Sequence, residues 1–191
     1  MDKDVLMDIF TRTGAIMKGH FLLTSGLHSD TYIQCARVLQ YPEYTAQLVS
    51  VIAGAFKEEG IGLVVGPAVG GILVAYETAR QLGVPALFTE REGGVMTLRR
   101  GFDIPAGARV LVVEDVVTTG GSVMEVIKVV KAQGAEVAGV GLLVDRSQGS
   151  IDFGVKKQVV LTLDVKTYSP ENCPMCREGT NAIKPGSRGL K

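Results

Sequence analysis

The sequence lacks several features that would each point to a particular partner or compartment. Its 20 basic and 20 acidic residues cancel, and no block of Lys and Arg is long enough to indicate a nucleic-acid-binding surface. No apolar stretch approaches the roughly 18 residues of a membrane span. The first ten residues carry acids and have no basic region before an apolar core, unlike a signal peptide. We expect a soluble, cytoplasmic protein with no nucleic-acid partner and no membrane contact.

Cysteine is also sparse. Cys35 stands alone, while Cys173 and Cys176 form a CPMC motif near the end. A tetrahedral structural zinc site needs four ligands. The chain has no second CxxC and no HxxxH motif, so we expect that only two chains pooling their cysteine pairs would complete such a site. A redox pair is the other functional interpretation. Incidental thiols in a reducing compartment are the interpretation that we favour.

The chain of 191 residues suits a single domain, residues 1–191. Predicted strands alternate with predicted helices, which favours an α/β fold with a doubly wound, mostly parallel sheet. The helices are expected over residues 4–17, 42–59, 71–82 and 122–133. The strands are expected over residues 62–67, 85–90, 110–113, 136–147 and 158–165.

Three segments fall outside this alternation. Residues 20–34 have strand-like stretches around a Thr-Ser-Gly turn, which predicts a small β element, a hood over about 18–36. We expect this hood to lie over the C-terminal edge of the core sheet, which occupies about 42–168. Residues 91–107 are polar and glycine-rich, which favours a mobile loop or a hairpin. A turn-rich tail occupies residues 169–191.

Residues 109–122, RVLVVEDVVTTGGS, carry the strongest functional signal. Their apolar run predicts a buried parallel strand, and Glu114 and Asp115 follow it at the edge where open α/β sheets bind ligands. Residues 118–122 come next, at the start of a helix, where unpaired backbone N–H groups favour an anion such as phosphate. Carboxylates beside a phosphate-binding loop indicate a site for a phosphorylated sugar. An ordinary strand, turn and helix with a Ser N-cap is the alternative.

This segment resembles the phosphoribosyl pyrophosphate (PRPP) signature of the type I phosphoribosyltransferases. In that signature an apolar strand, two acids and two further residues precede Thr-x-Gly-x-Thr/Ser. The resemblance implies the type I phosphoribosyltransferase fold and a PRPP site. The residues that it assigns to PRPP are Glu114, Asp115, Val116, Val117, Thr118, Thr119, Gly120, Gly121 and Ser122.

A second segment resembles the N-terminal signature of the orotate phosphoribosyltransferases, Leu-x-Ser-Gly-x-x-Ser-x-x-Tyr/Phe. The matching residues are Leu23, Ser25, Gly26, Ser29 and Tyr32. In that family the hood holds the pyrimidine, and an arginine that follows a strand and an acid contacts orotate. Arg146 follows Asp145 in this way, and a guanidinium can bind the orotate carboxylate bidentately. The resemblance therefore implies an orotate site of Thr118, Arg146, Ser25 and Tyr32. An ordinary hairpin and a solvated arginine are the alternatives.

The sequence departs from the family after residue 90. Many members have a lysine-rich loop with a histidine that closes over pyrophosphate in the neighbouring subunit. This stretch has neither residue type and offers Arg91, Arg99 and Arg100 instead. Arg91 matches the family's first loop arginine, which implies that it binds PRPP. Arg99 and Arg100 are candidate closing cations; solvated arginines are the alternative. Arginine can neutralise pyrophosphate but cannot donate a proton near neutral pH. The turn at residues 66–71 is either a further pyrophosphate loop or only a tight turn.

Together, the two signatures imply an enzyme that transfers the phosphoribosyl group from PRPP to orotate in pyrimidine biosynthesis. The products would be orotidine 5′-monophosphate and pyrophosphate. Its catalytic set would be Glu114, Asp115, Arg99 and Arg100, which stabilise charge and align the substrates. Mg²⁺ is the expected cofactor, with no direct protein ligand expected other than Asp115. The family's shared active site implies a homodimer.

Other functions share parts of this pattern. A purine-base phosphoribosyltransferase would have residues 110–122 but neither the hood signature nor the Asp-Arg pair. A non-catalytic PRPP-sensing regulator would need a nucleic-acid-binding surface. A dinucleotide-binding protein is disfavoured because neither GxGxxG nor GxxxxGK[ST] occurs. We expect no acid–base role for His20 or His28.

Overall fold

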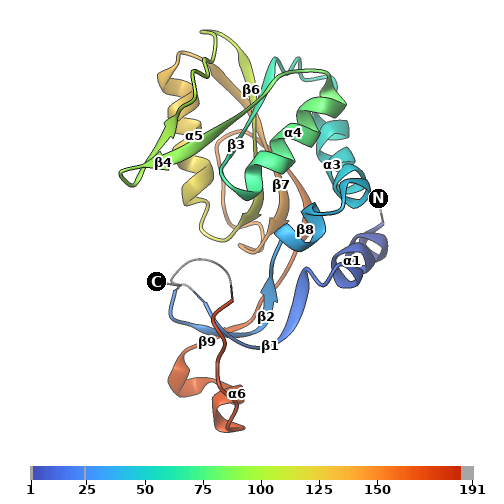
Figure 1. Ribbon diagram of the computed structural model, residues 1–191, viewed down its shortest axis with the longest axis vertical. Coiled ribbons are helices and arrows are strands. Elements are labelled where there is room, and N and C mark those ends of the chain that lie inside the picture. Colours follow the sequence, from blue (N-terminus) through green and yellow to red (C-terminus); the bar gives the residue numbers. More distant parts are fainter. Residues whose placement is uncertain (1, 24, 186–191) are drawn as a thin grey trace.

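A six-stranded sheet forms the core of the computed structural model, which describes residues 2–23 and 25–185. Thr24 of the predicted turn and residues 186–191 of the predicted tail lie outside the described residues. The strand order is β5-β4-β3-β6-β7-β8, and every neighbouring pair is parallel except β4 and β5 (Figure 1). The predicted α/β fold with a doubly wound, mostly parallel sheet is confirmed. The strands are β3 (Leu63–Pro67), β4 (Ala86–Glu92), β5 (Val95–Leu98), β6 (Arg109–Val117), β7 (Glu136–Asp145) and β8 (Lys156–Thr162).

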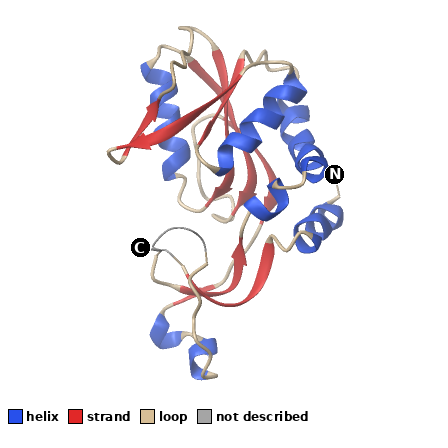
Figure 2. Ribbon diagram, viewed as in Figure 1, coloured by secondary structure: helices blue, strands red, loops and turns tan. Residues whose placement is uncertain are grey.

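Helices cover both faces of this sheet (Figure 2). Side chains alternate between the two faces of a strand. Leu111 and Val113 therefore pack against α3 and α4, whereas Val110 and Val112 pack against α5. A continuous apolar run is required because each central strand is buried on both sides. The helices of the core are α1 (Lys3–Arg12), α2 (Ala36–Leu39), α3 (Pro42–Phe56), α4 (Gly70–Leu82) and α5 (Gly121–Ala132). None of the described helices combines the length and the apolar character needed to cross a membrane.

The structure corrects one predicted helix and decides between the two alternatives for residues 91–107. The predicted helix over 4–17 ends at Arg12, because Gly14 adopts a left-handed conformation (φ 64°) and Ile16 already begins a strand. The segment over 91–107 begins as a hairpin, the second of the two predicted alternatives. Its strand β5 pairs antiparallel with an extended β4, and Met96 and Ile104 are buried in the core.

The hood is a second, three-stranded sheet in the order β1-β2-β9. It consists of β1 (Ile16–Leu22), β2 (His28–Ile33) and the two-residue β9 (Thr167–Tyr168), all antiparallel. The short η1 (Pro170–Asn172) and α6 (Pro174–Arg177) follow β9. Backbone hydrogen bonds of 2.8 Å join Ile183 to both His20 and Leu22. Segments near both ends of the chain therefore build the hood, which lies below the core sheet in Figure 1.

Candidate active site

The chain reverses its direction across the sheet between β3 and β6. After β3 it continues outward to β4 and β5, and then it returns to add β6 on the other side of β3. Ligands of open α/β sheets bind at such a switch point, beyond the carboxyl ends of the strands. A cavity of about 870 Å³ lies there, lined by the loop after β3, by residues 114–123 and by parts of the hood.

The acidic pair lies in the C-terminal half of β6, which extends to Val117 because it pairs with β7 as far as Asp145. Glu114 is only 7% exposed, and its carboxylate accepts a hydrogen bond of 3.0 Å from the Asp115 backbone N–H. Asp115 is half-buried, and its Oδ1 accepts from the Val116 N–H at 2.8 Å. The side chains of Val116 and Val117 pack into the apolar core on the two opposite faces of the sheet. Their backbone atoms, rather than their side chains, therefore face the cavity.

The glycine turn at residues 66–71 fits closely around the acidic pair. A Cβ on Gly70 would lie 2.1 Å from Asp115 Oδ2, and a Cβ on Gly66 would lie 2.4 Å from the Gly71 carbonyl oxygen. Both positions therefore require glycine for close approach, whether or not a ligand is bound. Residues 67–70 also line the large cavity, and the Ala68–Val69 peptide bond is cis. The turn is tightly packed and also borders the cavity, where a role in binding pyrophosphate stays a prediction.

Residues 118–122, which we call the phosphate loop after their predicted role, lead directly into α5. Gly120 is the N-cap residue, with φ 77°, and no described side chain caps the first turn of the helix. The Ser N-cap of the alternative interpretation is therefore absent there, since Ser122 lies inside the helix. Thr118 and Thr119 are exposed, and residues 118–122 line the large cavity. Open N–H groups at a helix start, beside hydroxyl groups, form a site suited to a phosphate.

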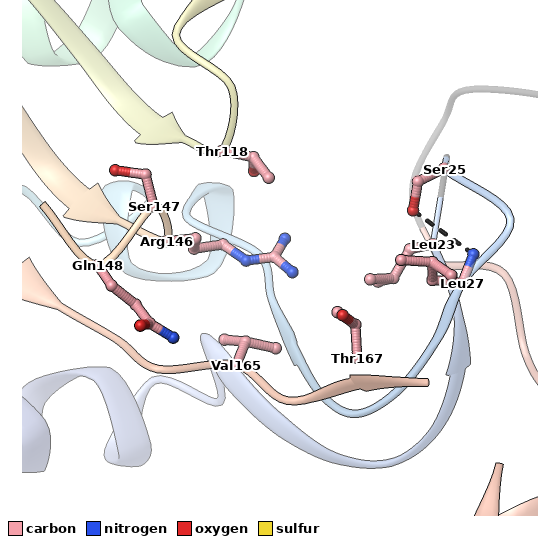
Figure 3. A pocket seen from close by; sticks show the side chains of 9 residues that line it. All are labelled: Leu23, Ser25, Leu27, Thr118, Arg146, Ser147, Gln148, Val165 and Thr167. Carbon is pink, nitrogen blue, oxygen red and sulfur yellow. Dashed lines mark hydrogen bonds between the residues drawn. The ribbon is translucent and has the colours of Figure 1, made fainter. Parts of the chain in front are cut away.

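A smaller cavity of about 360 Å³ adjoins the first one. The two share Leu23, Ser25, Thr118 and Arg146 in their linings. Figure 3 shows the Arg146 side chain extending into this smaller cavity between Thr118 and Thr167. The Nε of Arg146 is buried and has no hydrogen-bond partner among the described residues. Burial lowers the pKa of the Arg146 guanidinium, while Tyr32 and Cys35 oppose this shift. A cation with a buried, unpartnered donor is suited to an anionic ligand group.

Asp145 holds the turn from which Arg146 projects. Its side chain is buried, and its Oδ1 accepts hydrogen bonds from the backbone N–H of Ser147 (2.7 Å) and from the Ser147 hydroxyl (2.5 Å). Lys157 Nζ lies 3.8 Å from Asp145 Oδ2. The Arg146 N–H donates to the Val117 carbonyl at 2.8 Å, which fixes Arg146 beside the phosphate loop. Within the Asp-Arg pair, the acid therefore orients the turn and the arginine faces the cavities.

The hood signature divides into lining residues and structural residues. Ser25 lines both cavities, and Tyr32 lines the larger one, where its ring packs against Phe21. Ser29 is fully buried instead, and its hydroxyl lies 2.9 Å from the Lys166 carbonyl, to which it donates. Gln34 also lines the large cavity and was not predicted. Its position two residues after Tyr32, on the same side of an extended segment, is the signal that could have found it.

The three candidate loop arginines are all paired with acids. Arg91 lines the large cavity and contacts Glu125 of α5 at 2.5 Å. Arg99 lies 3.3 Å from Glu92, and Arg100 lies 2.7 Å from Glu90. Neither Arg99 nor Arg100 is among the described residues that line the two cavities. The structure therefore brings Arg91, but not the other two, to the cavity of its own chain.

The Cys35 side chain contacts the backbone of the acidic pair. Its thiol is 3% exposed and donates to the Asp115 carbonyl oxygen at 3.6 Å. Burial, together with the nearby Asp115 and Glu114 carboxylates, raises the pKa of the Cys35 thiol well above its ordinary value. The thiol is therefore protonated and inert at neutral pH. Nothing in the local sequence pattern signals this contact, which joins residues 80 positions apart.

Comparisons with known proteins agree with this geometry. The phosphoribosyl transferase domain family matches residues 41–158. The chain is 58% identical over 190 residues to an orotate phosphoribosyltransferase of Desulforamulus reducens and 57% identical over 190 residues to one of Pelotomaculum thermopropionicum, with 100% of both chains covered in each case. The crystal structure of orotate phosphoribosyltransferase from Aeropyrum pernix is 31% identical, with a TM-score of 0.72 over 83% of this chain and 93% of that chain. These matches show that the chain belongs to the orotate phosphoribosyltransferase family of phosphoribosyltransferase enzymes.

Proposed function

We propose that this protein transfers the 5-phosphoribosyl group of PRPP to orotate and releases orotidine 5′-monophosphate and pyrophosphate. The observation that carries the proposal is that the two cavities meet at Arg146 and Thr118. The larger cavity has acidic side chains and an uncapped helix N-terminus, which suit a phosphorylated sugar. The smaller one has a guanidinium, which suits a carboxylate. A phosphoribosyl donor and a carboxylate-bearing acceptor would therefore face each other.

In this proposal the protein binds PRPP along its whole length, from the 5′-phosphate through the ribose to the pyrophosphate. Glu114 and Asp115 accept hydrogen bonds from the ribose hydroxyls, and residues 118–122 bind the 5′-phosphate through N–H groups and hydroxyls. The turn at residues 67–70 borders the same cavity and would contact the pyrophosphate, with Arg91 beside it. Arg91 would then exchange its contact with Glu125 for one with the leaving group.

The chemistry asks for charge stabilisation and alignment rather than a protein nucleophile. As pyrophosphate leaves, positive charge develops on the ribose, and the carboxylates of Glu114 and Asp115 would stabilise it at short range. Arg146, Thr118, Ser25 and Tyr32 would fix the orientation of orotate so that its ring nitrogen meets the anomeric carbon. Holding both reactants in one geometry removes much of the entropic barrier of a bimolecular reaction.

Mg²⁺ is the proposed cofactor, and the cavity fits an ion that arrives with the substrate. Asp115 offers a half-buried carboxylate there. Among residues 2–23 and 25–185, the one group of three or more His, Cys, Asp or Glu ligands lies in the hood instead. Mg²⁺ commonly uses one or two carboxylates together with substrate phosphates and water. When bound, the ion would neutralise the charge of the leaving pyrophosphate.

Arg99 and Arg100 remain our candidates for covering pyrophosphate, in the neighbouring subunit of a homodimer. The Arg99–Glu92 pair is exposed, whereas Arg100 donates to both carboxylate oxygens of Glu90, whose side chain is 21% exposed. An exposed ion pair contributes little to stability, so pyrophosphate could replace Glu92 at small cost, and a phosphate group can accept the same two hydrogen bonds from Arg100 as Glu90 does. The dimer itself is supported by exposed apolar residues at one end of α4, which are Leu73 and Tyr76 in its first turns and Val69 at its N-cap. Analytical ultracentrifugation would detect it. Three free cysteines support our proposal of a cytoplasmic location.

An acceptor assay tests the proposed function. Orotate consumption should depend on both PRPP and Mg²⁺, and uracil, hypoxanthine and adenine should not replace orotate at equal concentration. Turnover of a purine base in place of orotate would support the purine-base alternative. PRPP binding without turnover of any base, together with salt-sensitive binding to nucleic acid, would support a regulator.

A further inference from the structure

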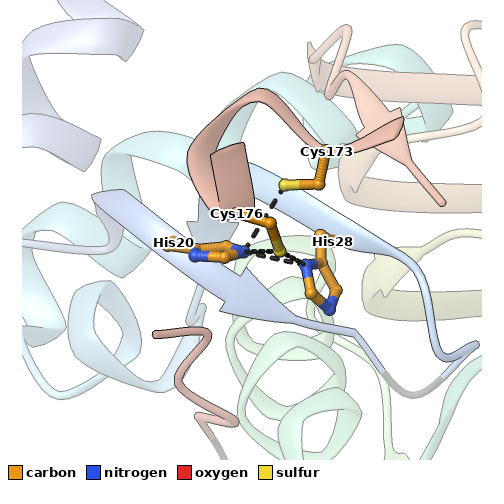
Figure 4. Close-up of side chains that lie close together, drawn as sticks. All are labelled: His20, His28, Cys173 and Cys176. Carbon is orange, nitrogen blue, oxygen red and sulfur yellow. Dashed lines mark hydrogen bonds between the residues drawn. The ribbon is translucent and has the colours of Figure 1, made fainter. Parts of the chain in front are cut away.

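Four side chains of the hood and tail converge on one another (Figure 4), and none of them lines either cavity. They are His20 of β1, His28 of β2, Cys173 immediately before α6 and Cys176 within α6. One nitrogen of each histidine and the sulfur of each cysteine all lie within 4.8 Å of one another. The prediction that only a second chain could complete a four-ligand set is therefore wrong. The two missing ligands are histidines of the same chain, which the β1–β2 hairpin brings together.

The distances in this cluster suit a tetrahedral zinc ion. With Zn–S bonds of about 2.3 Å and Zn–N bonds of about 2.0–2.1 Å, sulfur and nitrogen ligands lie about 3.5 Å apart. Cys173 Sγ lies 3.5 Å from His20 Nε2, and Cys176 Sγ lies 3.7 Å from His20 Nε2 and 3.3 Å from His28 Nδ1. The two ring nitrogens are 2.8 Å apart, so the rings would separate by about 0.5 Å around an ion.

The surroundings of His20 also fit a metal ligand. Its Nδ1 lies 3.0 Å from the Thr180 carbonyl oxygen, to which an Nδ1–H would donate. This hydrogen bond leaves the lone pair on Nε2, the nitrogen that faces the cluster. A metal-binding histidine commonly donates its other N–H to a backbone carbonyl in this way, which fixes the ring. His20, His28 and Cys173 are 7%, 8% and 0% exposed, so three of the four ligands are shielded from water.

Few other interactions stabilise the fold of the hood. An isolated hairpin is marginally stable in water, and β9 adds only two residues to it. The cluster would join both strands of that hairpin to the tail, beside the hydrogen bonds of Ile183 with His20 and Leu22. Small structural units without a large core commonly depend on a metal or a disulfide for stability.

We propose that His20, His28, Cys173 and Cys176 form a structural zinc site that fixes the tail to the β1–β2 hairpin. Two thiolates and two neutral imidazoles balance the charge of Zn²⁺. Four protein ligands leave no open position for a substrate, so the site is structural rather than catalytic. The proposal is independent of the acceptor and donor roles assigned above.

Metal analysis of the purified full-length protein, made without a histidine tag and kept reduced, tests the proposal. We expect about one zinc ion per chain in the wild type and in Cys35→Ala, which removes the cysteine outside the cluster. Cys176→Ser should lose most of this zinc. A strong chelator should lower the Tm of the wild type and of Cys35→Ala but leave that of Cys176→Ser unchanged.

A titration with Co²⁺ needs no variant and therefore does not depend on the folding of Cys176→Ser. The metal-free wild type should take up one equivalent and develop the intense visible absorption of tetrahedral, thiolate-bound Co²⁺, and Zn²⁺ should abolish it. Two results would overturn the proposal. One is that the reduced wild type binds neither ion, and the other is that zinc binds equally well to Cys176→Ser.

Discussion

Replacing Gly70 by Ala should inactivate the enzyme with little effect on the fold. The new Cβ would lie 2.1 Å from Asp115 Oδ2 and 2.4 Å from its Cγ. To restore an ordinary van der Waals separation of 3.4 Å, the carboxylate would have to move by about 1.3 Å. Such a movement breaks the hydrogen bond that Asp115 Oδ1 accepts from the Val116 N–H at 2.8 Å.

The expected loss follows from this displacement. A misplacement of about 1 Å in an active site can cost about 100-fold in rate. We therefore expect kcat/KM for PRPP to fall about 100-fold, equivalent to about 2.7 kcal/mol of transition-state stabilisation. The free energy of unfolding should change by less than about 1 kcal/mol, because Asp115 is half-buried and alanine favours the helix that begins at residue 70.

Steady-state kinetics and urea denaturation measure the two quantities, and Gly54→Ala is the matched control. Gly54 lies inside α3, and a Cβ there meets no atom within 4 Å. This variant should keep its full activity. Gly70→Ala should also add less than about threefold to the loss caused by Asp115→Asn, because both changes act on one carboxylate. A Gly70→Ala enzyme with activity within threefold of the wild type would refute the reasoning.

Three further substitutions probe the remaining assignments. Asp115→Asn should lower kcat severely with an unchanged far-UV circular dichroism spectrum; near wild-type rates at saturating PRPP and Mg²⁺ would contradict its role. Arg146→Ala should raise KM for orotate about 10- to 100-fold and KM for PRPP much less, since it removes charge-assisted hydrogen bonds; equal losses for both substrates would exclude a carboxylate clamp. Because the pKa of Cys35 is raised on folding, its contribution is complete below the unfolded pKa of about 8.5 and is lost as pH rises towards the folded value. Cys35→Ala should therefore lessen the fall in unfolding free energy above about pH 8.5, by up to about 1.4 kcal/mol per pH unit; identical slopes would contradict the raised pKa.

The residues proposed to bind PRPP could be predicted from the sequence because they are contiguous in the chain. A buried strand fixes where Glu114 and Asp115 emerge, and the chain passes directly from them into the phosphate loop and α5. The same local logic identified Arg146 at the end of β7. The fold class followed from the alternation of strands and helices, and the family followed from the two signatures.

Features that depend on contacts between distant segments escaped the sequence. Cys173 and His20 are 153 positions apart, and only the pairing of β2 with β9 reveals that they meet. The partners of Arg99 and Arg100 are set by the β4–β5 register, which a polar, glycine-rich stretch does not specify. The predicted helix over 4–17 was too long for a local reason. Its apolar spacing continues past Arg12, but the left-handed backbone at Gly14 ends the helix.

The pairing of β2 with β9 also sets the order in which the protein can mature on the ribosome. Its hairpin strands are synthesised well before their partners at residues 167–183. The hood therefore stays incomplete until residues 167–183 have been synthesised, and the cavity that Ser25 and Tyr32 line gains its final shape only after that. A nascent chain released early would carry a phosphate loop but no finished wall opposite it.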